Sequence, residues 1–128
     1  MKITEHFDSK ELKINELEFE KIINLINIVQ KILEPVRLYT DTTIIITSAL
    51  RTVEENKKVD GVKNSQHLTG NAIDFILKDK AKLQKAINFI QEELEFDQLI
   101  HEHKHGAEWL HVSLVKEGNR QEFLEIWK

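Results

Sequence analysis

A histidine and an aspartate stand at positions from which they could share a metal ion. His67 and Asp74 lie seven residues apart in the segment Ser65–Asp74. Ligand atoms that are each about 2 Å from one zinc ion must lie within roughly 4 Å of each other. Seven residues span roughly 10 Å in a helix and roughly 23 Å in a strand, so the chain must turn back between the two. Thr69-Gly70 can supply that turn, although unrelated partners would be the simpler interpretation of this pair alone.

Asp74 itself lies within an apolar run, Ala72–Leu77, that is typical of a buried strand. A carboxylate in such a strand needs a compensating partner, because burying an unpaired charge is strongly unfavourable. A metal ion is one such partner, and Arg51 or a lysine is another.

His111 occurs in a second strand-like run, Trp109–Val115, in which every second residue is apolar. Strand alternation therefore places His111 on the opposite face from that apolar set, together with Trp109 and Ser113. This face of the predicted strand carries side chains that are suited to chemistry.

His67, Asp74 and His111 together would give a metal ion three protein ligands and one open position. That is the arrangement of a catalytic zinc site, in which a water molecule in the open position becomes acidic near neutral pH. Such a site also needs a general base. Glu108, three residues before His111, is the nearest candidate.

Composition limits the other possibilities. The chain has 128 residues, which predicts a single domain, residues 1–128, with 41% hydrophobic and 31% charged residues, as in globular proteins. It has no cysteine, so any metal must be held by His, Asp or Glu. The formal net charge is −4 and no basic stripe is visible, so we expect no nucleic-acid partner. We also expect no membrane span, because no apolar run is long enough.

Periodicity predicts the elements that must position these residues. Apolar residues at three-four spacing predict a helix over 17–36, which Pro35 either kinks or divides from a second short helix. Asp8-Ser9 offers capping chemistry for a short helical turn near the N-terminus. The remaining predicted elements are strands over 43–47, 72–77, 96–103 and 109–115, and helices over 53–58, 79–94 and 123–127. Mixed elements with hairpin-like connections predict an α+β fold.

Several spaced motifs resemble one enzyme family. The pattern Ser-x-His-x-x-Gly-x-Ala-x-Asp over 65–74, followed by Glu-x-x-His over 108–111, resembles the zinc D,D-peptidases. These include D-Ala-D-Ala carboxypeptidases, the VanX and VanY enzymes and phage L-alanyl-D-glutamate endolysins, and their fold is shared with the Hedgehog signalling domain. Segments 47–52, 61–67 and 96–100 also match in order. The resemblance implies a Hedgehog/DD-peptidase-like fold, a small mainly antiparallel sheet with helices packed on it.

The resemblance also implies roles for single residues. Zinc would be bound by His67, Asp74 and His111, with Glu108 as the general base. Small members of the family can carry this acid on the preceding strand after Gln-Leu-Ile, where this chain has Glu102, so Glu102 is the rival for the role. Arg51 would stabilise the oxyanion or hold a substrate carboxylate, although Ala-Leu replaces the usual Gly-Tyr before it. The expected substrate-binding residues are Arg51, Ser65, Gln66 and Trp109.

The function that the resemblance implies is hydrolysis of a peptide bond in peptidoglycan stem peptides, of carboxypeptidase or endopeptidase type. The alternative is a non-catalytic, zinc-stabilised interaction module of the same fold. The N-terminal residues Met1–His6 include an acid and a histidine before any apolar run, so we expect no signal peptide. We therefore expect a monomer that is cytoplasmic at synthesis and acts on the cell wall if it is phage-derived or otherwise exported.

Three further histidines, His101, His103 and His105, alternate at strand spacing. They invite a second metal site, since one face of a strand would present all three. The alternative is a solvated rim of the active site. We favour the rim, because the sequence shows no carboxylate or distant histidine that completes a ligand set, and Lys104 would oppose a cation.

Overall fold

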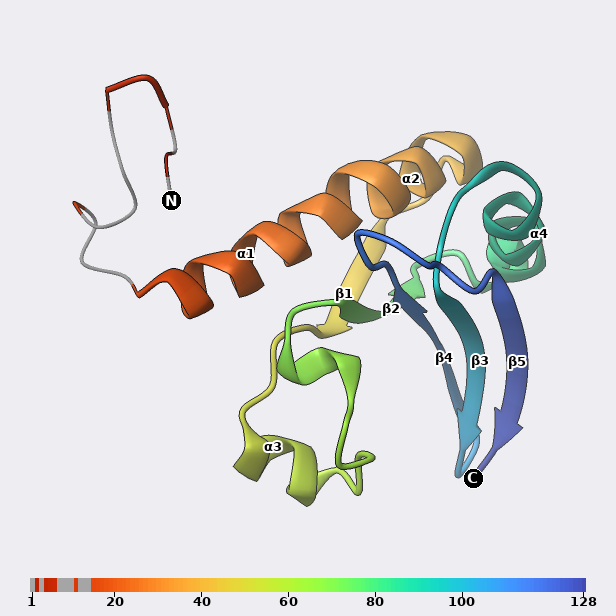
Figure 1. The fold of residues 1–128 in the computed structure, drawn as a ribbon. Coiled ribbons are helices and arrows are strands. Elements are labelled where there is room, and N and C mark those ends of the chain that lie inside the picture. The colour runs from red at the N-terminus through yellow and green to blue at the C-terminus, as the bar shows by residue number, and fades with distance from the viewer. Residues whose placement is uncertain (1, 3, 7–10, 12–14) are drawn as a thin grey trace.

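The computed structural model describes residues 2, 4–6, 11 and 15–128, so the helical turn expected after Asp8-Ser9 lies outside the described residues. A long helical segment, a five-stranded mixed sheet and a second helix layer account for most of the described chain (Figure 1). The α+β class expected from the sequence is confirmed. Within the described part of the chain, no helix combines the length and the apolar character that crossing a bilayer would require.

The helical segment consists of α1 (Glu16–Ile28), a π-helical turn η2 (Val29–Leu33) and α2 (Glu34–Thr40). It begins where the Asn15 side chain accepts a hydrogen bond from the backbone N–H of Glu18 at 2.9 Å. Pro35 has no N–H to donate, so it is tolerated only near the start of a helix, and here it stands in the first turn of α2. Of the two outcomes expected at Pro35, the structure therefore shows the second short helix, entered through the wide turn η2.

The sheet has the strand order β1-β2-β4-β3-β5. All neighbouring strands are antiparallel except β3 and β5, which run parallel. The strands are β1 (Ile44–Ser48), β2 (Ala72–Leu77), β3 (Gln98–Lys104), β4 (Ala107–Ser113) and β5 (Glu122–Trp127).

One prediction is wrong: residues 123–127 form most of strand β5 and not a helix. Five residues are too few to separate a helical from a strand period. The deciding factor is non-local, because the free edge of β3 offers backbone partners along its whole length, from the pair Gln98 and Glu122 to the pair His103 and Trp127.

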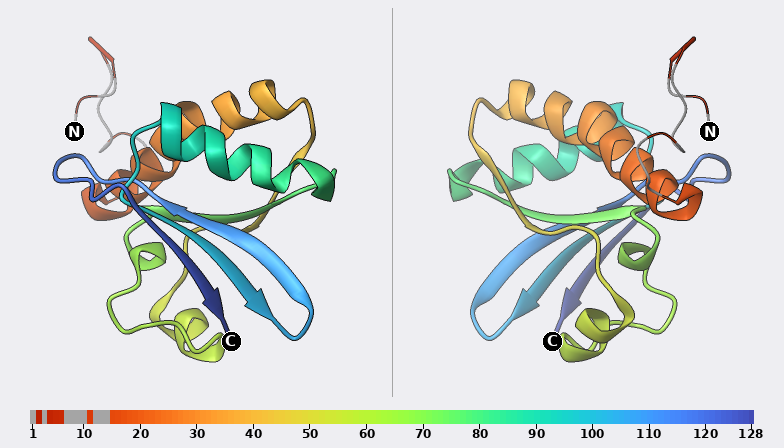
Figure 2. Two further views of the ribbon diagram at one scale, coloured as in Figure 1. Left: turned by 90° about the vertical axis from the view of Figure 1, so that its right-hand side faces the viewer. Right: turned by 90° about the vertical axis from the view of Figure 1, so that its left-hand side faces the viewer.

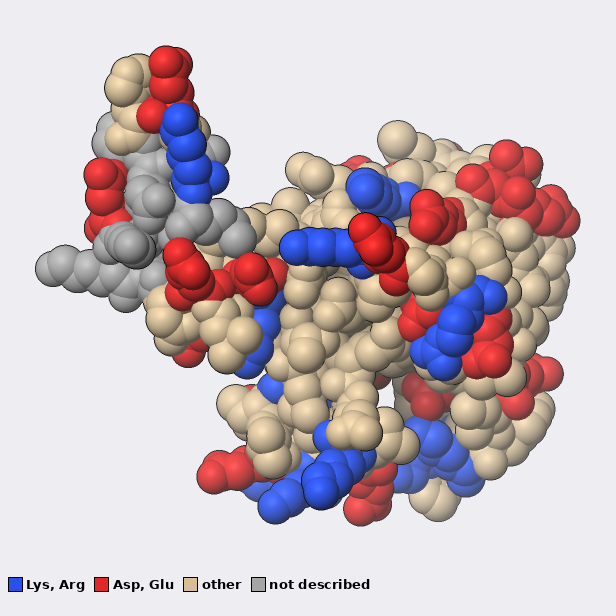
Figure 3. All heavy atoms as spheres, viewed as in Figure 1, with Lys and Arg blue, Asp and Glu red and all other residues tan. Residues whose placement is uncertain are grey.

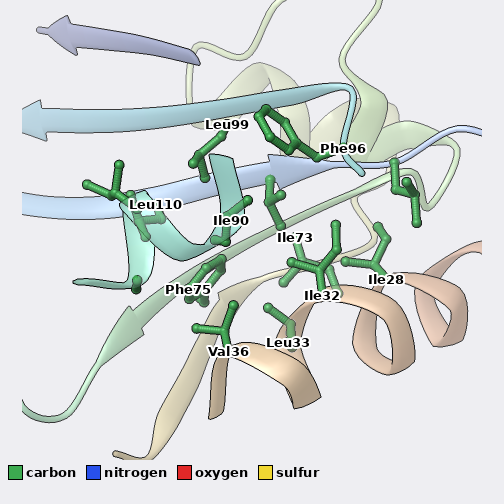
Figure 4. Close-up of a cluster of buried hydrophobic side chains, with 14 of the residues drawn as sticks. Ile28, Ile32, Leu33, Val36, Ile73, Phe75, Ile90, Phe96, Leu99 and Leu110 are labelled. Atoms are coloured by element: carbon green, nitrogen blue, oxygen red, sulfur yellow. The ribbon is translucent and has the colours of Figure 1, made fainter. Parts of the chain in front are cut away.

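Helices cover one face of the sheet. Figure 2 shows α1, α2 and α4 (Leu83–Glu93, preceded by a 3-10 turn η4, Lys80–Lys82) on the same side, while the β3–β4 hairpin extends beyond them. Figure 4 shows Ile28, Ile32 and Val36 of the helical segment directed toward Phe75 and Ile73 of β2. Full burial of each such side chain contributes roughly 1.5–3 kcal/mol, so this layer holds β2 and β4 rigidly in place.

The opposite face of the sheet carries the short helix α3 (Val53–Lys58) and the 3-10 turn η3 (Gln66–Leu68) (Figure 2). Thr52 and Glu55 form a reciprocal capping box at the start of α3. In Figure 3, basic and acidic side chains are interspersed over the face in view, and the surface is hollowed between the α3 segment and the C-terminal strands. His67 reaches the sheet from this side.

Candidate metal centre

Two histidines converge on one oxygen atom of Asp74. His67 Nε2 lies 3.0 Å and His111 Nδ1 lies 2.9 Å from Asp74 Oδ1. Asp74 and His111 are direct cross-strand partners on β2 and β4, while His67 comes from η3 above the sheet. Donor atoms of a tetrahedral zinc site, each about 2.0–2.1 Å from the metal, are separated by roughly 3.3 Å. The three side chains thus present donor atoms at nearly the separation that one zinc ion requires.

The hydrogen bonds of His67 define which ring nitrogen is available. Its Nδ1–H donates to the carbonyl oxygen of Ala49 at 2.7 Å, because a carbonyl can only accept. In the neutral ring, Nε2 then carries a lone pair and points at the Asp74 carboxylate. Two electron-rich atoms 3.0 Å apart are stabilised by a cation between them. This arrangement, with the second nitrogen bonded to a backbone carbonyl, is typical of metal-ligating histidines.

Asp74 is almost fully buried and is held in its charged form. Burial raises the pKa of Asp74, but its close contacts with the His111 and His67 rings outweigh burial and hold its pKa well below the usual range. Arg51 adds a third contact, donating from Nη2 to Asp74 Oδ2 at 3.1 Å. From the sequence, we expected a metal ion or Arg51 as the partner of this carboxylate. The structure leaves room for both partners, because Oδ1 faces the histidines and Oδ2 faces the Arg51 guanidinium.

The family comparison covers this cluster. A model described as Peptidase M15 matches residues 5–113, a range that contains His67, Asp74 and His111. The chain belongs to the Peptidase M15 family. This membership confirms the resemblance to zinc D,D-peptidases, and a family of zinc-dependent peptidases agrees with a donor set of two imidazoles and one carboxylate. None of the curated proteins matches the chain.

Arg51 of this M15 peptidase is oriented by two residues that sequence reasoning did not single out. Its Nε donates to Ser48 Oγ at 3.1 Å and its Nη1 donates to Asn56 Oδ1 at 3.3 Å. Asn56 is buried on α3 and also donates to the carbonyl oxygen of Val62 at 2.8 Å. The sequence carries no signal for Asn56, because the helix is polar on all sides after Val53 and its buried side is decided by tertiary packing. The guanidinium is thereby aimed at the Asp74 carboxylate.

Ser65 and Gln66, which were expected to bind substrate, make contacts that position His67. Ser65 Oγ accepts a hydrogen bond from the His67 N–H at 3.2 Å at the start of η3. Gln66 donates from Nε2 to Asp97 Oδ2 at 2.8 Å. Asp97 is buried and also binds the Arg120 guanidinium, so it ties η3 to the chain that precedes β5.

The turn between His67 and Asp74 depends on Gly70. This residue is buried and has φ +78°, a left-handed conformation that favours glycine. A Cβ atom here would lie 2.3 Å from the backbone oxygen of Lys21 on α1. The close packing of this turn on α1 is what allows the chain to reverse and bring His67 over Asp74.

The two candidate general bases lie on opposite faces of the sheet. Glu102 pairs across the strands with Trp109, two residues before His111, so its side chain shares the face of His111 and Asp74. Glu108 is three residues before His111 and faces the helix side, where its Oε2 lies 2.9 Å from His101 Nε2. The structure thus brings Glu102, and not Glu108, to the face of the candidate metal centre.

Glu102 and Trp109 form a defined pair beside the ligands. The indole N–H of Trp109 donates to Glu102 Oε2 at 2.6 Å, and Lys128 Nζ lies 2.8 Å from Glu102 Oε1. Trp109 also lines a cavity of about 370 Å³ with Thr47 and Ile76, where β2 and β4 diverge. Lys80, Leu83 and Glu108 also line this cavity, and Glu102 does not.

Proposed function

We propose that this chain is a zinc metallopeptidase that hydrolyses a peptide bond in peptidoglycan stem peptides. Family membership supports the peptidase class, and the observation that carries the metal site is the convergence of His67 Nε2 and His111 Nδ1 on Asp74 Oδ1. When bound by these three residues, zinc supplies Lewis-acid chemistry that acidifies water near neutral pH. The protein's own contribution is to hold the ligands, aim the substrate and move protons.

Glu102 is our candidate for the residue that moves protons. It lies on the ligand face, and its side chain is 11% exposed, so it meets substrate in a partly desolvated setting. In the reaction, water adds to the carbonyl carbon, and the proton that water loses passes to the Glu102 carboxylate. The C–N bond then breaks as the same proton passes to the leaving nitrogen. The hydrogen bond from Trp109 fixes the carboxylate for both transfers.

Arg51 acts through Asp74 in this proposal. Its bond to Asp74 Oδ2 leaves Oδ1 directed at the two histidines, and its remaining N–H groups can bind a substrate oxygen. Trp109 offers an apolar surface to the substrate beside the cavity at the end of β2. Ser65 and Gln66 support the position of His67 and are not assigned a substrate contact.

We further propose that residues 1–128 act as one catalytic domain and as a monomer. The interspersed charges and the net charge of −4 support a peptide substrate over a nucleic acid.

Digestion of purified peptidoglycan, with products identified by mass spectrometry, tests the activity. We expect new stem-peptide ends, loss of activity after chelation and recovery on adding zinc. The identity of the new ends distinguishes a carboxypeptidase, which releases terminal D-alanine, from an endopeptidase. His67→Ala should lose both metal and activity while retaining its circular dichroism spectrum.

The interaction module remains the competing function, and the same experiment separates the two. A folded, zinc-loaded protein that releases no product from peptidoglycan or its stem peptides would contradict the enzyme and favour the module. Activity that survives complete removal of zinc would instead contradict the metal centre.

A further inference from the structure

Four side chains from three strands meet on the helix side of the β3–β4 hairpin, beyond the helices. They are His101 and His103 of β3, Glu108 of β4 and Glu125 of β5. His101 lies 2.9 Å from Glu108 Oε2 through Nε2 and 3.1 Å from Glu125 Oε2 through Nδ1. His103 Nε2 lies 3.0 Å from the same Glu125 oxygen, and His103 Nδ1 lies 3.7 Å from Glu108 Oε2. Donor atoms of His101, His103 and Glu108 all lie within 4.8 Å of one another.

The strand register explains how the cluster forms. Glu108 is the direct partner of His103 across β3 and β4, and Glu125 is the direct partner of His101 across β3 and β5. The sequence favoured a solvated rim because no carboxylate completed a set, and the structure supplies two. Lys104 alternates to the opposite face from His103, so strand geometry directs its charge away from the cluster.

The positions of the carboxylates at the ring nitrogens are compatible with a bound cation. A neutral imidazole has one N–H, so it can donate to only one of two flanking carboxylates. His101 has a carboxylate oxygen within 3.1 Å of each of its ring nitrogens. In a neutral ring, one lone pair would therefore face an anionic oxygen. A metal ion bound by His101 Nε2, His103 Nδ1 and Glu108 would leave the other ring N–H of each histidine to donate to Glu125, as is typical of metal-ligating histidines.

We propose that His101, His103 and Glu108 form a second site for a divalent transition-metal ion, with Glu125 accepting a hydrogen bond from the other ring nitrogen of each histidine. Two imidazoles and one carboxylate suit zinc and its neighbours cobalt and nickel better than magnesium or calcium, which prefer ligand sets made of oxygen. Solvent can deliver the ion, because the side chains of Glu108 and Glu125 are 42% and 48% exposed. The site does not depend on the proposed peptidase centre, which lies on the other face of the sheet. Glu125 also lies beyond residues 5–113, the range of the family match.

The predicted consequence of binding is a link between β3 and β4 near the end of the hairpin, with Glu125 of β5 held by hydrogen bonds from the two ligand imidazoles. The other face of this hairpin carries Glu102, Trp109 and His111. An ion in the second site would therefore stiffen the strands that hold half of the proposed active site. It would also hold β5, which is attached to the sheet through β3 alone.

Metal stoichiometry of the full chain, prepared without a histidine tag, tests the proposal. The metal-free protein is titrated with Zn²⁺ and, after gel filtration, bound zinc is measured by mass spectrometry of the element. We expect two equivalents in the wild type, one in His101→Gln and one in His111→Ala. His105→Gln is the matched control and should keep two, because His105 is an exposed residue of the turn after β3.

The number of zinc equivalents bound by each variant separates failure of this site from failure of the proposed peptidase centre. One equivalent that disappears in His111→Ala and persists in His101→Gln would overturn the second site and leave the first. One equivalent that disappears in His101→Gln and persists in His111→Ala would support the second site and contradict the metal centre of the proposed function. Equal losses in His105→Gln and His101→Gln would also overturn the proposal, because binding would then follow histidine content and not position.

Tryptophan fluorescence supplies a second readout. The ring of Trp127 stacks on His103 with centroids 3.6 Å apart, so an ion bound to His103 lies close to this indole. The chain has two tryptophans, and the variant Trp109→Phe leaves Trp127 as the reporter. We expect Ni²⁺ to quench this fluorescence by at least half, with saturation at one equivalent, and Glu125→Gln to weaken the binding tenfold or more. Quenching that is absent, or unchanged by Glu125→Gln, would overturn the site.

Discussion

Glu108 and His111 stand three residues apart on β4, and their side chains therefore point to opposite faces of the sheet. The spacing Glu-x-x-His drew attention to Glu108 as a base, yet its carboxylate contacts His101 on the helix side. Glu102, from the neighbouring strand, lies on the ligand face through its pairing with Trp109. Glu102, the cross-strand neighbour of Trp109, therefore shares the face of the candidate metal centre, and Glu108, the sequence neighbour of Trp109, does not.

Substitution of the proposed base should separate chemistry from metal binding. We expect Glu102→Gln to lower kcat on a stem peptide by about 100- to 10,000-fold, the usual contribution of a general acid-base residue. Bound zinc should remain, because Glu102 is not among the three converging ligands. Glu108→Gln should lower kcat by less than about tenfold, through the hairpin alone. The reverse order of the two effects in steady-state kinetics would contradict the assignment.

The pH dependence of stability should report on Asp97. Its hydrogen bonds with Arg120 hold the pKa of the carboxyl at about 2, below the ordinary value of about 3.9. A carboxyl with a depressed pKa stabilises the fold above its unfolded-state pKa and loses this contribution as pH falls through the folded-state pKa. The contribution, about 2 kcal/mol at neutral pH, should therefore disappear between about pH 4 and pH 2.

Urea denaturation at a series of pH values checks this expectation. Asp97→Asn should lower the free energy of unfolding at pH 7 and flatten its slope between about pH 4 and pH 2. Asp60→Asn, at an exposed position, is the matched control and should keep the slope. An unchanged slope in Asp97→Asn would show that other carboxylates account for the acid sensitivity.

Gly70→Ala tests the turn that brings His67 back to Asp74. A Cβ at this position would meet the Lys21 backbone oxygen at 2.3 Å, in addition to the strain of a positive φ. Gly118 also has a positive φ, +76°, but a Cβ there meets no atom within 4 Å. Gly118→Ala should therefore show only the backbone strain, about 1–2 kcal/mol, and Gly70→Ala a larger loss with weaker zinc binding. Thermal denaturation and zinc titration measure both, and equal losses would contradict the role of the close contact.

Asn56→Ala tests the support of Arg51. The buried amide binds both the Arg51 guanidinium and the Val62 carbonyl oxygen, and its loss would leave these groups without that partner. We expect the free energy of unfolding to fall by about 1–3 kcal/mol. Asn64→Ala, at an exposed position in the following loop, should change it by less than about 0.5 kcal/mol. Chemical denaturation compares the two, and similar small effects would mean that solvent replaces the Asn56 contacts.

Local patterns predicted much of the fold. The strand Ala72–Leu77 and the helix Val53–Lys58 occur at the predicted bounds. Each is specified by its own local sequence, the strand by a continuous apolar run and the helix by its capping box. The wrong helix over 123–127 has a different origin. Its five residues obtain their structure from the edge of β3, more than twenty positions earlier in the chain.

The sequence by itself determined the family and the three residues that converge on one oxygen, since His67, Asp74 and His111 each lie in a recognisable local motif. Strand alternation, also local, separates Glu108 from His111. Only the tertiary structure decided which carboxylate joins which histidines. The face that Glu102 shares with His111, and the meeting of Glu125 with His101, depend on strand order and register, which arise from pairing between distant segments.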